Sequence, residues 1–164
     1  MSSGLDLAAL PEEDVQSYPR PPLVEPVSQR LRVVLGGQVV AETQRGWRVC
    51  ETHHAPTYYI PPEDVAEGAL RPSRGSSYCE WKGRAAYWDV TGGDVTRARA
   101  AWSYPEPTAR YAAIAGFLAF YPGLMESCFV GRVAVTPQPG DFYGGWATPN
   151  LTGTIKGGPG TLGW

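Results

Sequence analysis

Lys82 is the residue with the clearest potential for chemistry, because it stands in an aromatic stretch, SSYCEWKGRAAYWDV (76–90), of a chain that has only two lysines. The other 12 of the 14 basic side chains are arginines. Lysine is rarely buried without a partner, so a lysine between Trp81 and Gly83 suggests a cleft in which a carboxylate faces the ammonium. Desolvation lowers the pKa of such a lysine from about 10.4, and the amine would then act as an acid or a base. The alternative is a surface lysine on a strand.

The acidic partner of Lys82 has three candidates in the sequence, Glu63, Asp64 and Asp89. We expect Asp64 to pair with the lysine or to orient it. In this arrangement Lys82 would anchor an acidic or carbonyl group of a ligand.

Cys79 is the candidate nucleophile of the same stretch. A thiol with a pKa of about 8.5 needs a positive neighbour to react at neutral pH, and Lys82 would supply it. An offset of three residues places the two side chains on opposite faces of a regular strand, so they would meet only across a turn or a bulge, for which Gly83 is a weak indication. A pair with His53 or His54 is a second possibility. The alternative is a buried structural cysteine.

Tyrosine and tryptophan side chains would form the walls of such a cleft, because they combine a large apolar surface with a polar tip that needs a partner. The alternative assignment for the same rings is the hydrophobic core. The side chains that we predict to line the site are Tyr59, Tyr87, Trp102, Tyr104 and Tyr121.

Metal and phosphate chemistry have little support. The three cysteines are far apart, and the adjacent His53 and His54 cannot easily present both rings to one ion, so we predict no metal site and no cofactor. The glycine-rich KGGPGTLG near the C-terminus has its lysine in the wrong place for a P-loop. A backbone anion nest is possible there. The simpler interpretation is a tail that passes closely over a sheet.

Short strands joined by tight turns must position these residues. The clearest is a hairpin in RLRVVLGGQVVAETQ, whose Gly36–Gly37 pair suits a type I′ turn. The other expected elements are strands at 46–52, 57–60, 82–90, 116–121 and in ARAAWSYPEP up to Pro105, a helical turn at Pro62, a short helix at 108–114 and a hairpin about Gly131. The predicted fold is mainly β, a single compact domain with a complex antiparallel sheet, tent-like or barrel-like, and one or two short helices.

The chain divides by composition into three segments. Residues 1–28 are a proline-rich arm, with four prolines in YPRPPLVEP that favour extension without strand pairing, and they would either lie on the domain or extend into solvent. Residues 29–136 would be the core domain, and 137–164 an irregular extension packed on it.

Charge and hydropathy exclude several classes of partner. A net charge of −2 and a pI near 5.7 are wrong for nucleic acid or anionic lipid. No apolar run approaches the 18 or so residues of a membrane span, and the N-terminus lacks the basic start of a secretory signal. We therefore expect a cytoplasmic protein whose partner is a small molecule.

Four stretches in order, PTYYIPPEDV, SYCEWKGRAAYWDV, AAWSYPEP and IAGFLAFYP, resemble the domain-of-unknown-function 427 family. The usual form of the second stretch is Cys-Pro-Tyr-Lys-Gly-x-Ala-x-Tyr. Cys79, Lys82, Gly83 and Tyr87 fit it, while Glu80 and Trp81 replace Pro-Tyr. The tail resembles a C-terminal extension of one bacterial branch of the family.

The resemblance implies a small tent-like β fold without zinc knuckles and no assigned role. A nucleotidyltransferase label used for the family would need a Gly-Ser followed by paired aspartates, which this chain lacks. The positions that match the family, and that would line or support a pocket, are Tyr59, Pro61, Asp64, Cys79, Lys82, Gly83, Tyr87, Trp102, Tyr104, Pro107 and Tyr121.

Two functions remain open on the sequence. The first is an aromatic-lined cleft centred on Lys82 that binds a small organic molecule, with or without catalysis. The second is an interaction module, in which the arm and the tail contact another chain or a second copy in a homodimer.

Overall fold

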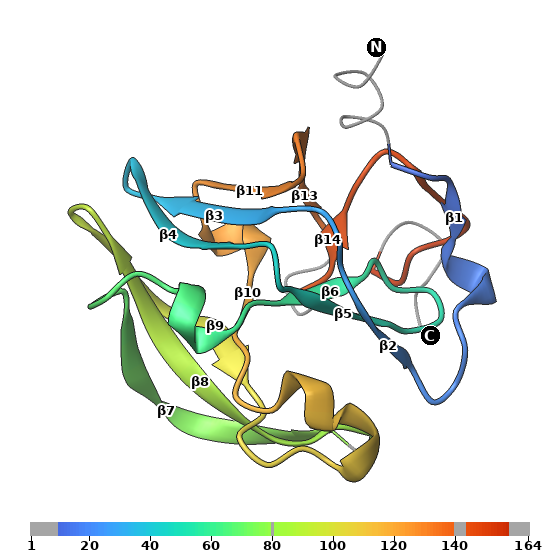
Figure 1. Ribbon diagram of the computed structural model, residues 1–164, viewed down its shortest axis with the longest axis horizontal. Helices are drawn as coiled ribbons and strands as arrows, with labels where there is room; N and C mark the ends of the chain where they lie inside the picture. The colour runs from blue at the N-terminus through green and yellow to red at the C-terminus, as the bar shows by residue number, and fades with distance from the viewer. Residues whose placement is uncertain (1–9, 80, 140–143, 158–164) are drawn as a thin grey trace.

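The computed structural model describes residues 10–79, 81–139 and 144–157, which fold into several small, mostly antiparallel sheets that do not close into a barrel (Figure 1). The central sheet has the order β10-β9-β8-β7, with β7 Leu70–Cys79, β8 Gly83–Gly92, β9 Val95–Ser103 and β10 Ala119–Phe120. The second has the order β12-β11-β3-β4, with β3 Leu31–Leu35, β4 Gln38–Thr43, β11 Ser127–Val130 and β12 Val133–Ala134. The prediction of a mainly β domain with short helices is confirmed.

Smaller elements complete the fold. A third sheet, β2-β5-β6, contains β2 Leu23–Pro26, β5 Trp47–Cys50 and β6 Thr57–Tyr59. Two pairs of short strands follow: β1 Glu13–Asp14 with β15 Leu151–Thr152, and β13 Thr136–Pro137 with β14 Trp146–Ala147. The helical turns are η1 Val15–Ser17, η2 Pro62–Asp64, η3 Ala109–Ile114 and η4 Pro122–Leu124. None of the helices among the described residues has the length and apolar character needed to cross a membrane.

Two hairpin tips lie against each other and join the two larger sheets (Figure 1). In the β3–β4 turn Gly36 and Gly37 have φ values of 60° and 74°, the left-handed region that a type I′ turn requires. A Cβ atom on Gly36 would collide with the backbone of Gly92 in β8, and one on Gly92 with the backbone of Leu35. The glycines are therefore needed for the turn and for the close approach of the two tips.

The described residues form three hydrophobic clusters, of which the smallest consists of Val15, Tyr18 and Cys50. The main core fills the space next to the β3–β4–β11 sheet, and the second, which we call the aromatic cluster, lies next to β5, β6 and η3. Neighbouring residues of one strand enter different cores: Ala101 of β9 belongs to the main core and Trp102 to the aromatic cluster, and Tyr58 and Tyr59 of β6 divide in the same way. The buried part of β9, from Ala100 to Ser103, and Tyr58 and Tyr59 of β6 thus face a core on each side, which fixes the directions of these side chains.

The described part of the proline-rich arm lies on the domain. Leu23–Pro26 pairs with Trp47–Cys50 as strand β2, although its prolines predict extension without pairing. The pairing is possible because β2 is the edge strand of its sheet, where proline is tolerated. Glu13 pairs with Leu151, so the arm and the C-terminal extension also meet each other.

Candidate functional site

Lys82 lies in the tight turn that joins β7 to β8, and not in a continuous strand. Cys79 is the last residue of β7 and pairs with Gly83, the first residue of β8, whose φ is 106°. The turn is fastened to the start of η3, because Thr108 donates its N–H to Lys82 O at 3.2 Å and its hydroxyl to Trp81 O at 2.5 Å. The side chains of Cys79 and Lys82 could meet only if a turn lay between the two residues. The structure has such a turn.

The aromatic cluster receives this turn. Lys82 is 8 % exposed, and its Nζ lies 5.8 Å from the centroid of the Tyr104 ring. The Tyr59 and Tyr104 centroids are 6.5 Å apart, and those of Trp102 and Tyr121 are 4.5 Å apart. The cluster consists of buried Val49, Tyr59, Ala85, Trp102, Tyr104, Tyr111, Ile114 and Ala119, with partly buried Val24, Trp47, Cys79, Trp81, Tyr87, Phe117 and Tyr121. The predicted residues Tyr59, Cys79, Lys82, Tyr87, Trp102, Tyr104 and Tyr121 thus lie together, and Asp64 does not.

The Lys82 ammonium has an unusual environment. Within the described residues no carboxylate lies within ion-pair distance of it and no hydrogen bond reaches it, whereas every fully buried side-chain nitrogen and oxygen has a partner. The ammonium therefore keeps access to solvent while its stem is buried. The Tyr104 ring is a weak electrostatic partner at this distance.

Asp64 belongs to a different part of the surface. Its Oδ2 accepts a hydrogen bond of 2.6 Å from the Thr43 hydroxyl, and its Oδ1 one of 3.0 Å from Arg45. The bond from Thr43, with the help of Arg45, holds the pKa of this carboxyl below its usual range. It lines a shallow depression of about 280 Å³ between β4 and η2. Neither Asp64 nor Asp89, which accepts from the N–H of Arg99 at 3.0 Å, is the partner of Lys82.

His54, which the sequence suggests as a possible partner of Cys79, lies in a charged environment. Burial is the main reason why the pKa of His54 lies below its ordinary value, and the charges of Lys156 and Lys82 act in the same direction, while Glu51 opposes them. The Nε2 atom of His54 lies 3.9 Å from Glu51 Oε2. The loop between β5 and β6 therefore brings an imidazole and an acid into the electrostatic range of Lys82.

The hydroxyls of Tyr59, Tyr104 and Tyr121 stay protonated at neutral pH. Burial raises the pKa of Tyr59 and of Tyr104, and burial together with Tyr87 raises that of Tyr121 to about 12. Tyr87 shares a hydrogen bond of 2.7 Å with Ser77. The rings therefore offer neutral hydrogen-bonding groups next to a cation.

The accessibility of Cys79 provides a first test. All three cysteines are free thiols; Cys50 and Cys128 are buried, and burial raises the pKa of each to about 12, whereas Cys79 is half-buried. We expect iodoacetamide at pH 8 to alkylate Cys79 in the native protein and Cys50 and Cys128 only in denaturant, as read by mass spectrometry of peptides. Cys79→Ser is the control and should remove native labelling. Native alkylation of Cys128 before Cys79 would contradict the arrangement of the cores.

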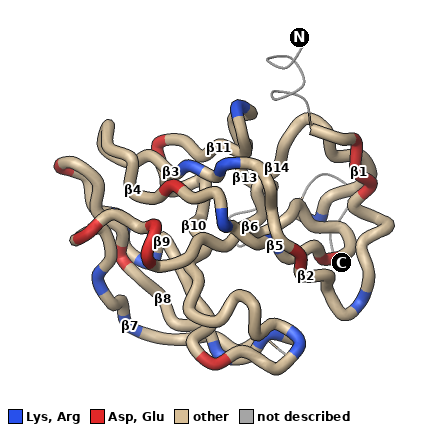
Figure 2. Tube along the Cα trace, viewed as in Figure 1, with Lys and Arg blue, Asp and Glu red and all other residues tan. Residues whose placement is uncertain are grey.

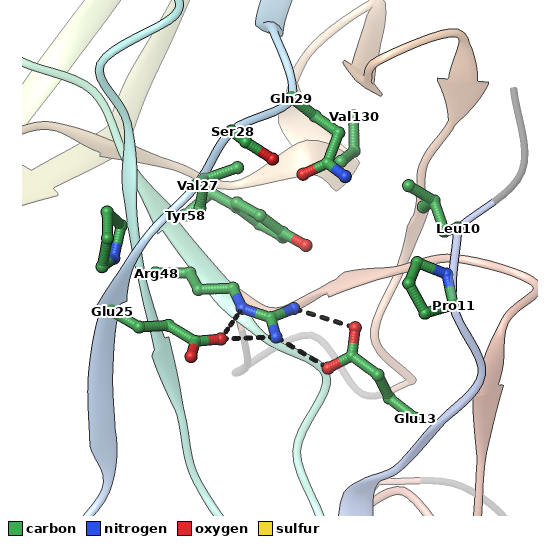
Figure 3. Close-up of a pocket in the computed structure, with 11 residues that line it drawn as sticks. Leu10, Pro11, Glu13, Glu25, Val27, Ser28, Gln29, Arg48, Tyr58 and Val130 are labelled. Carbon is green, nitrogen blue, oxygen red and sulfur yellow. Dashed lines mark hydrogen bonds and ion pairs between the residues drawn. The ribbon is translucent and has the colours of Figure 1, made fainter. Parts of the chain in front are cut away.

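A second concave region surrounds Arg48, between the arm and β5 (Figure 3). Its volume is about 140 Å³. Figure 3 shows the guanidinium between two carboxylates: it donates to Glu13 at 2.8 and 3.1 Å, and Nε donates to Glu25 at 2.7 Å. The charges here satisfy one another, so this region is better suited to holding the arm than to binding a ligand.

Basic and acidic positions are mixed along the described part of the chain. Figure 2 shows the Lys and Arg positions interspersed with Asp and Glu along the chain. Over residues 10–79, 81–139 and 144–157, no group of three or more His, Cys, Asp or Glu side chains is arranged to hold a metal ion.

Comparison with known proteins identifies the family of the chain. Residues 23–131, about two thirds of the chain, match the family described as domain of unknown function (DUF427). No curated protein matches the chain. The matched region contains the β7–β8 turn, the aromatic cluster and His54, and it ends before Gln138 and Lys156 of the extension. The chain belongs to the DUF427 family.

Proposed function

We propose that this domain binds a small organic molecule at the aromatic cluster, with Lys82 as the anchor for an acidic or carbonyl group. The observation that supports the proposal is the state of the Lys82 ammonium, which has a buried stem, keeps access to solvent, and has no carboxylate partner in the described part of the chain. A cation in a partly apolar environment that lacks a counter-charge is unfavourable, and an oxygen ligand would relieve that cost.

The surrounding rings explain why the ligand would be organic. Tyr104 and Trp102 are buried with rigid neighbours, and partly exposed Tyr87 and Tyr121 add hydroxyl groups at the rim. Small-molecule sites commonly combine such apolar walls with a few polar groups that fix orientation. Binding is the primary function that we propose; a reaction would use Lys82 as acid or base, or Cys79 as nucleophile.

The alternative of an interaction module has less support. The described part of the arm pairs with β5 and β15, and the extension places Trp146 in the main core. Both segments are therefore used within the chain, which favours the binding function.

A thermal-shift screen of small metabolites against wild type and Lys82→Met tests the proposal. A ligand at about 100 times its Kd stabilises by about 2.7 kcal/mol, which corresponds to a rise in Tm of roughly 5–10 °C for a chain of this size. We expect Lys82→Met, which keeps most of the packing of the stem, to abolish the shift. Arg84→Met is the matched control, because it removes an exposed cation from the same hairpin.

Each result of the thermal-shift screen has its own interpretation. A ligand shift that survives in Lys82→Met, or that is lost equally in Arg84→Met, would show that the lysine is not the anchor. The screen also gives the Tm of each variant without ligand, so a general loss of stability is recognised directly.

A further inference from the structure

We propose that the exposed edge of β7 at Ser76–Cys79 binds an extended peptide segment of a partner protein, in which acidic side chains alternate with apolar ones. The peptide would add a strand to the four-stranded central sheet. The inference goes beyond the binding function proposed above and does not depend on it, because it concerns the outer edge of the sheet and not the ammonium of Lys82.

The edge of β7 is open. β7 is the last strand of its sheet, at the outside of the molecule, and pairs only with β8 (Figure 1). In the described part of the chain Ser76–Cys79 form no backbone hydrogen bond outside this hairpin. Because successive residues of a strand direct their N–H and C=O groups to opposite sides, half of these groups point away from β8. Such an edge is a template for another strand.

The two halves of β7 differ in how their edge is protected. In the first half Pro72 lacks an N–H, Arg74 carries a charge, and the register with β8 is interrupted between Pro72 and Ser76. Proline, charge and irregular pairing are the usual devices that prevent strand addition. In the second half Ser76–Cys79 pair regularly with β8 and contain no proline and no charged side chain. The edge beside the β7–β8 turn is therefore suited to accepting a strand.

One face of this half attracts acidic side chains. Tyr78 and Arg84 lie opposite each other in the hairpin, and Arg84 Nη1 donates to Ser76 Oγ at 3.2 Å. Both are exposed, and Tyr78, at 74 %, is the most exposed large hydrophobic side chain of the described residues. In the same part of the chain no carboxylate lies within ion-pair distance of Arg71, Arg74 or Arg84. A carboxylate of a peptide on this face would have the Arg84 guanidinium as its partner.

The other face favours apolar side chains. Ser77 and Cys79 lie on the side of the hairpin opposite to Tyr78, because successive side chains of a strand alternate between its faces. Cys79 and Ala85 of this face belong to the aromatic cluster. The Ser77 hydroxyl already shares a hydrogen bond with Tyr87, at 2.7 Å. A strand added here would alternate in the same way, so acidic residues would face Arg84 and apolar residues would face Cys79.

A second copy of the chain is a poorer occupant of this edge. β7 contains two arginines and no acid, and Arg84 faces it from β8. The one acidic residue of β8, Asp89, lies opposite Arg71, in the protected half of the strand. Two β7 edges in contact would bring the arginines of both copies together, and facing like charges destabilise a sheet. Charge therefore favours an acidic partner over self-association.

The charge preference is tested with a short fluorescein-labelled peptide of alternating Glu and Val, titrated at low salt and followed by anisotropy. We expect it to bind the wild type at least about tenfold more tightly than the same peptide with Lys for Glu. Arg84→Glu should reverse this preference. Arg132→Glu, at an exposed arginine between β11 and β12, changes the net charge equally and should keep it. Equal binding of the two peptides to the wild type, or equal effects of the two variants, would overturn the inference.

Backbone pairing is tested on the peptide, so that the protein stays unchanged. N-methylation of every Val or of every Glu removes the N–H donors from one edge of the peptide strand or from the other. We expect one of these peptides to bind like the unmodified one and the other at least about tenfold more weakly. Equal effects of the two modifications would show that the peptide does not add as a strand. Light scattering of the wild type alone should give a monomer; a dimer that excludes the peptide would show that a second copy occupies the edge, and would overturn the inference.

Discussion

Replacing Trp146 with alanine is expected to lower the free energy of unfolding by about 3–5 kcal/mol, the usual cost of removing a large aromatic side chain from a core. Trp146 has no exposed surface, and its ring centroid lies 5.1 Å from that of Tyr58. The indole N–H donates to Phe120 O at 3.0 Å, and the backbone N–H donates to Pro56 O at 2.8 Å. Urea unfolding followed by circular dichroism measures the loss.

Trp146→Phe separates the contribution of ring packing from that of the indole hydrogen bond. It keeps an aromatic ring in the core but leaves the Phe120 carbonyl without its donor, so we expect a smaller cost, about 1–3 kcal/mol. Leu124→Ala, at a side chain that is 39 % exposed, is the surface control and should change stability little. A cost below about 1 kcal/mol for Trp146→Ala would mean that the extension is not part of the main core.

The hairpins of the fold could be predicted because their turns carry local information. Gly36–Gly37 and Gly131 adopt the positive φ that their positions demand, and the β-branched residues around them mark the strands. Strand β7 could not be predicted in the same way. It is an edge strand, largely exposed, with Pro72 and Gly75 beside an interruption of its register, so no alternation of apolar residues marks it.

The residues of the candidate site also differ in how far the local sequence predicts their positions. Cys79, Lys82 and Tyr87 lie within one hairpin, and the sequence places them close together. The sequence predicts a strand that begins at Lys82, whereas Lys82 lies in the turn before β8, because the family-like stretch contains the end of β7 as well as β8. The family-like stretch PTYYIPPEDV predicts Asp64 as a site residue, but its carboxylate binds Thr43 and Arg45 instead.

The contacts that could not be predicted join residues that are far apart in the sequence. Gln138 bonds to His54 across 84 positions of the chain, and neither residue stands in a recognisable pattern. The adjacent histidines indicated only possible metal or thiol partners. The contact depends on the extension returning over the β5–β6 loop, where Trp146 N–H binds Pro56 O, and no spacing rule encodes that path.

Replacing Arg48 with methionine is expected to lower the free energy of unfolding by about 3 kcal/mol at pH 7. Arg48 holds Glu13 of β1 and Glu25 of β2, and its side chain is only 17 % exposed. Breaking a buried ion pair costs about 3–5 kcal/mol, because the remaining charge is uncompensated. The lower end applies here, since Glu25 remains 34 % exposed. Chemical unfolding at constant salt measures the change, and Arg30→Met, at a half-exposed arginine 3.9 Å from Glu42, is the surface control.

The pH dependence distinguishes a charge effect from a packing effect. Burial would raise the pKa of Glu13, but hydrogen bonds from Arg48 and Tyr18 outweigh it and hold this pKa below its ordinary 4.5. A carboxyl with a lowered folded-state pKa stabilises the protein above its unfolded-state pKa, and this contribution is lost as the pH falls through the folded-state value. The difference between wild type and Arg48→Met should therefore be largest near pH 7 and shrink below about pH 4.5. Glu13→Gln in the Arg48→Met background should recover part of the stability at pH 7, because it removes a carboxylate without its partner. A difference that stays constant from pH 7 to pH 3 would show that the lost packing of the arginine stem, and not its charge, fastens the arm to the sheet.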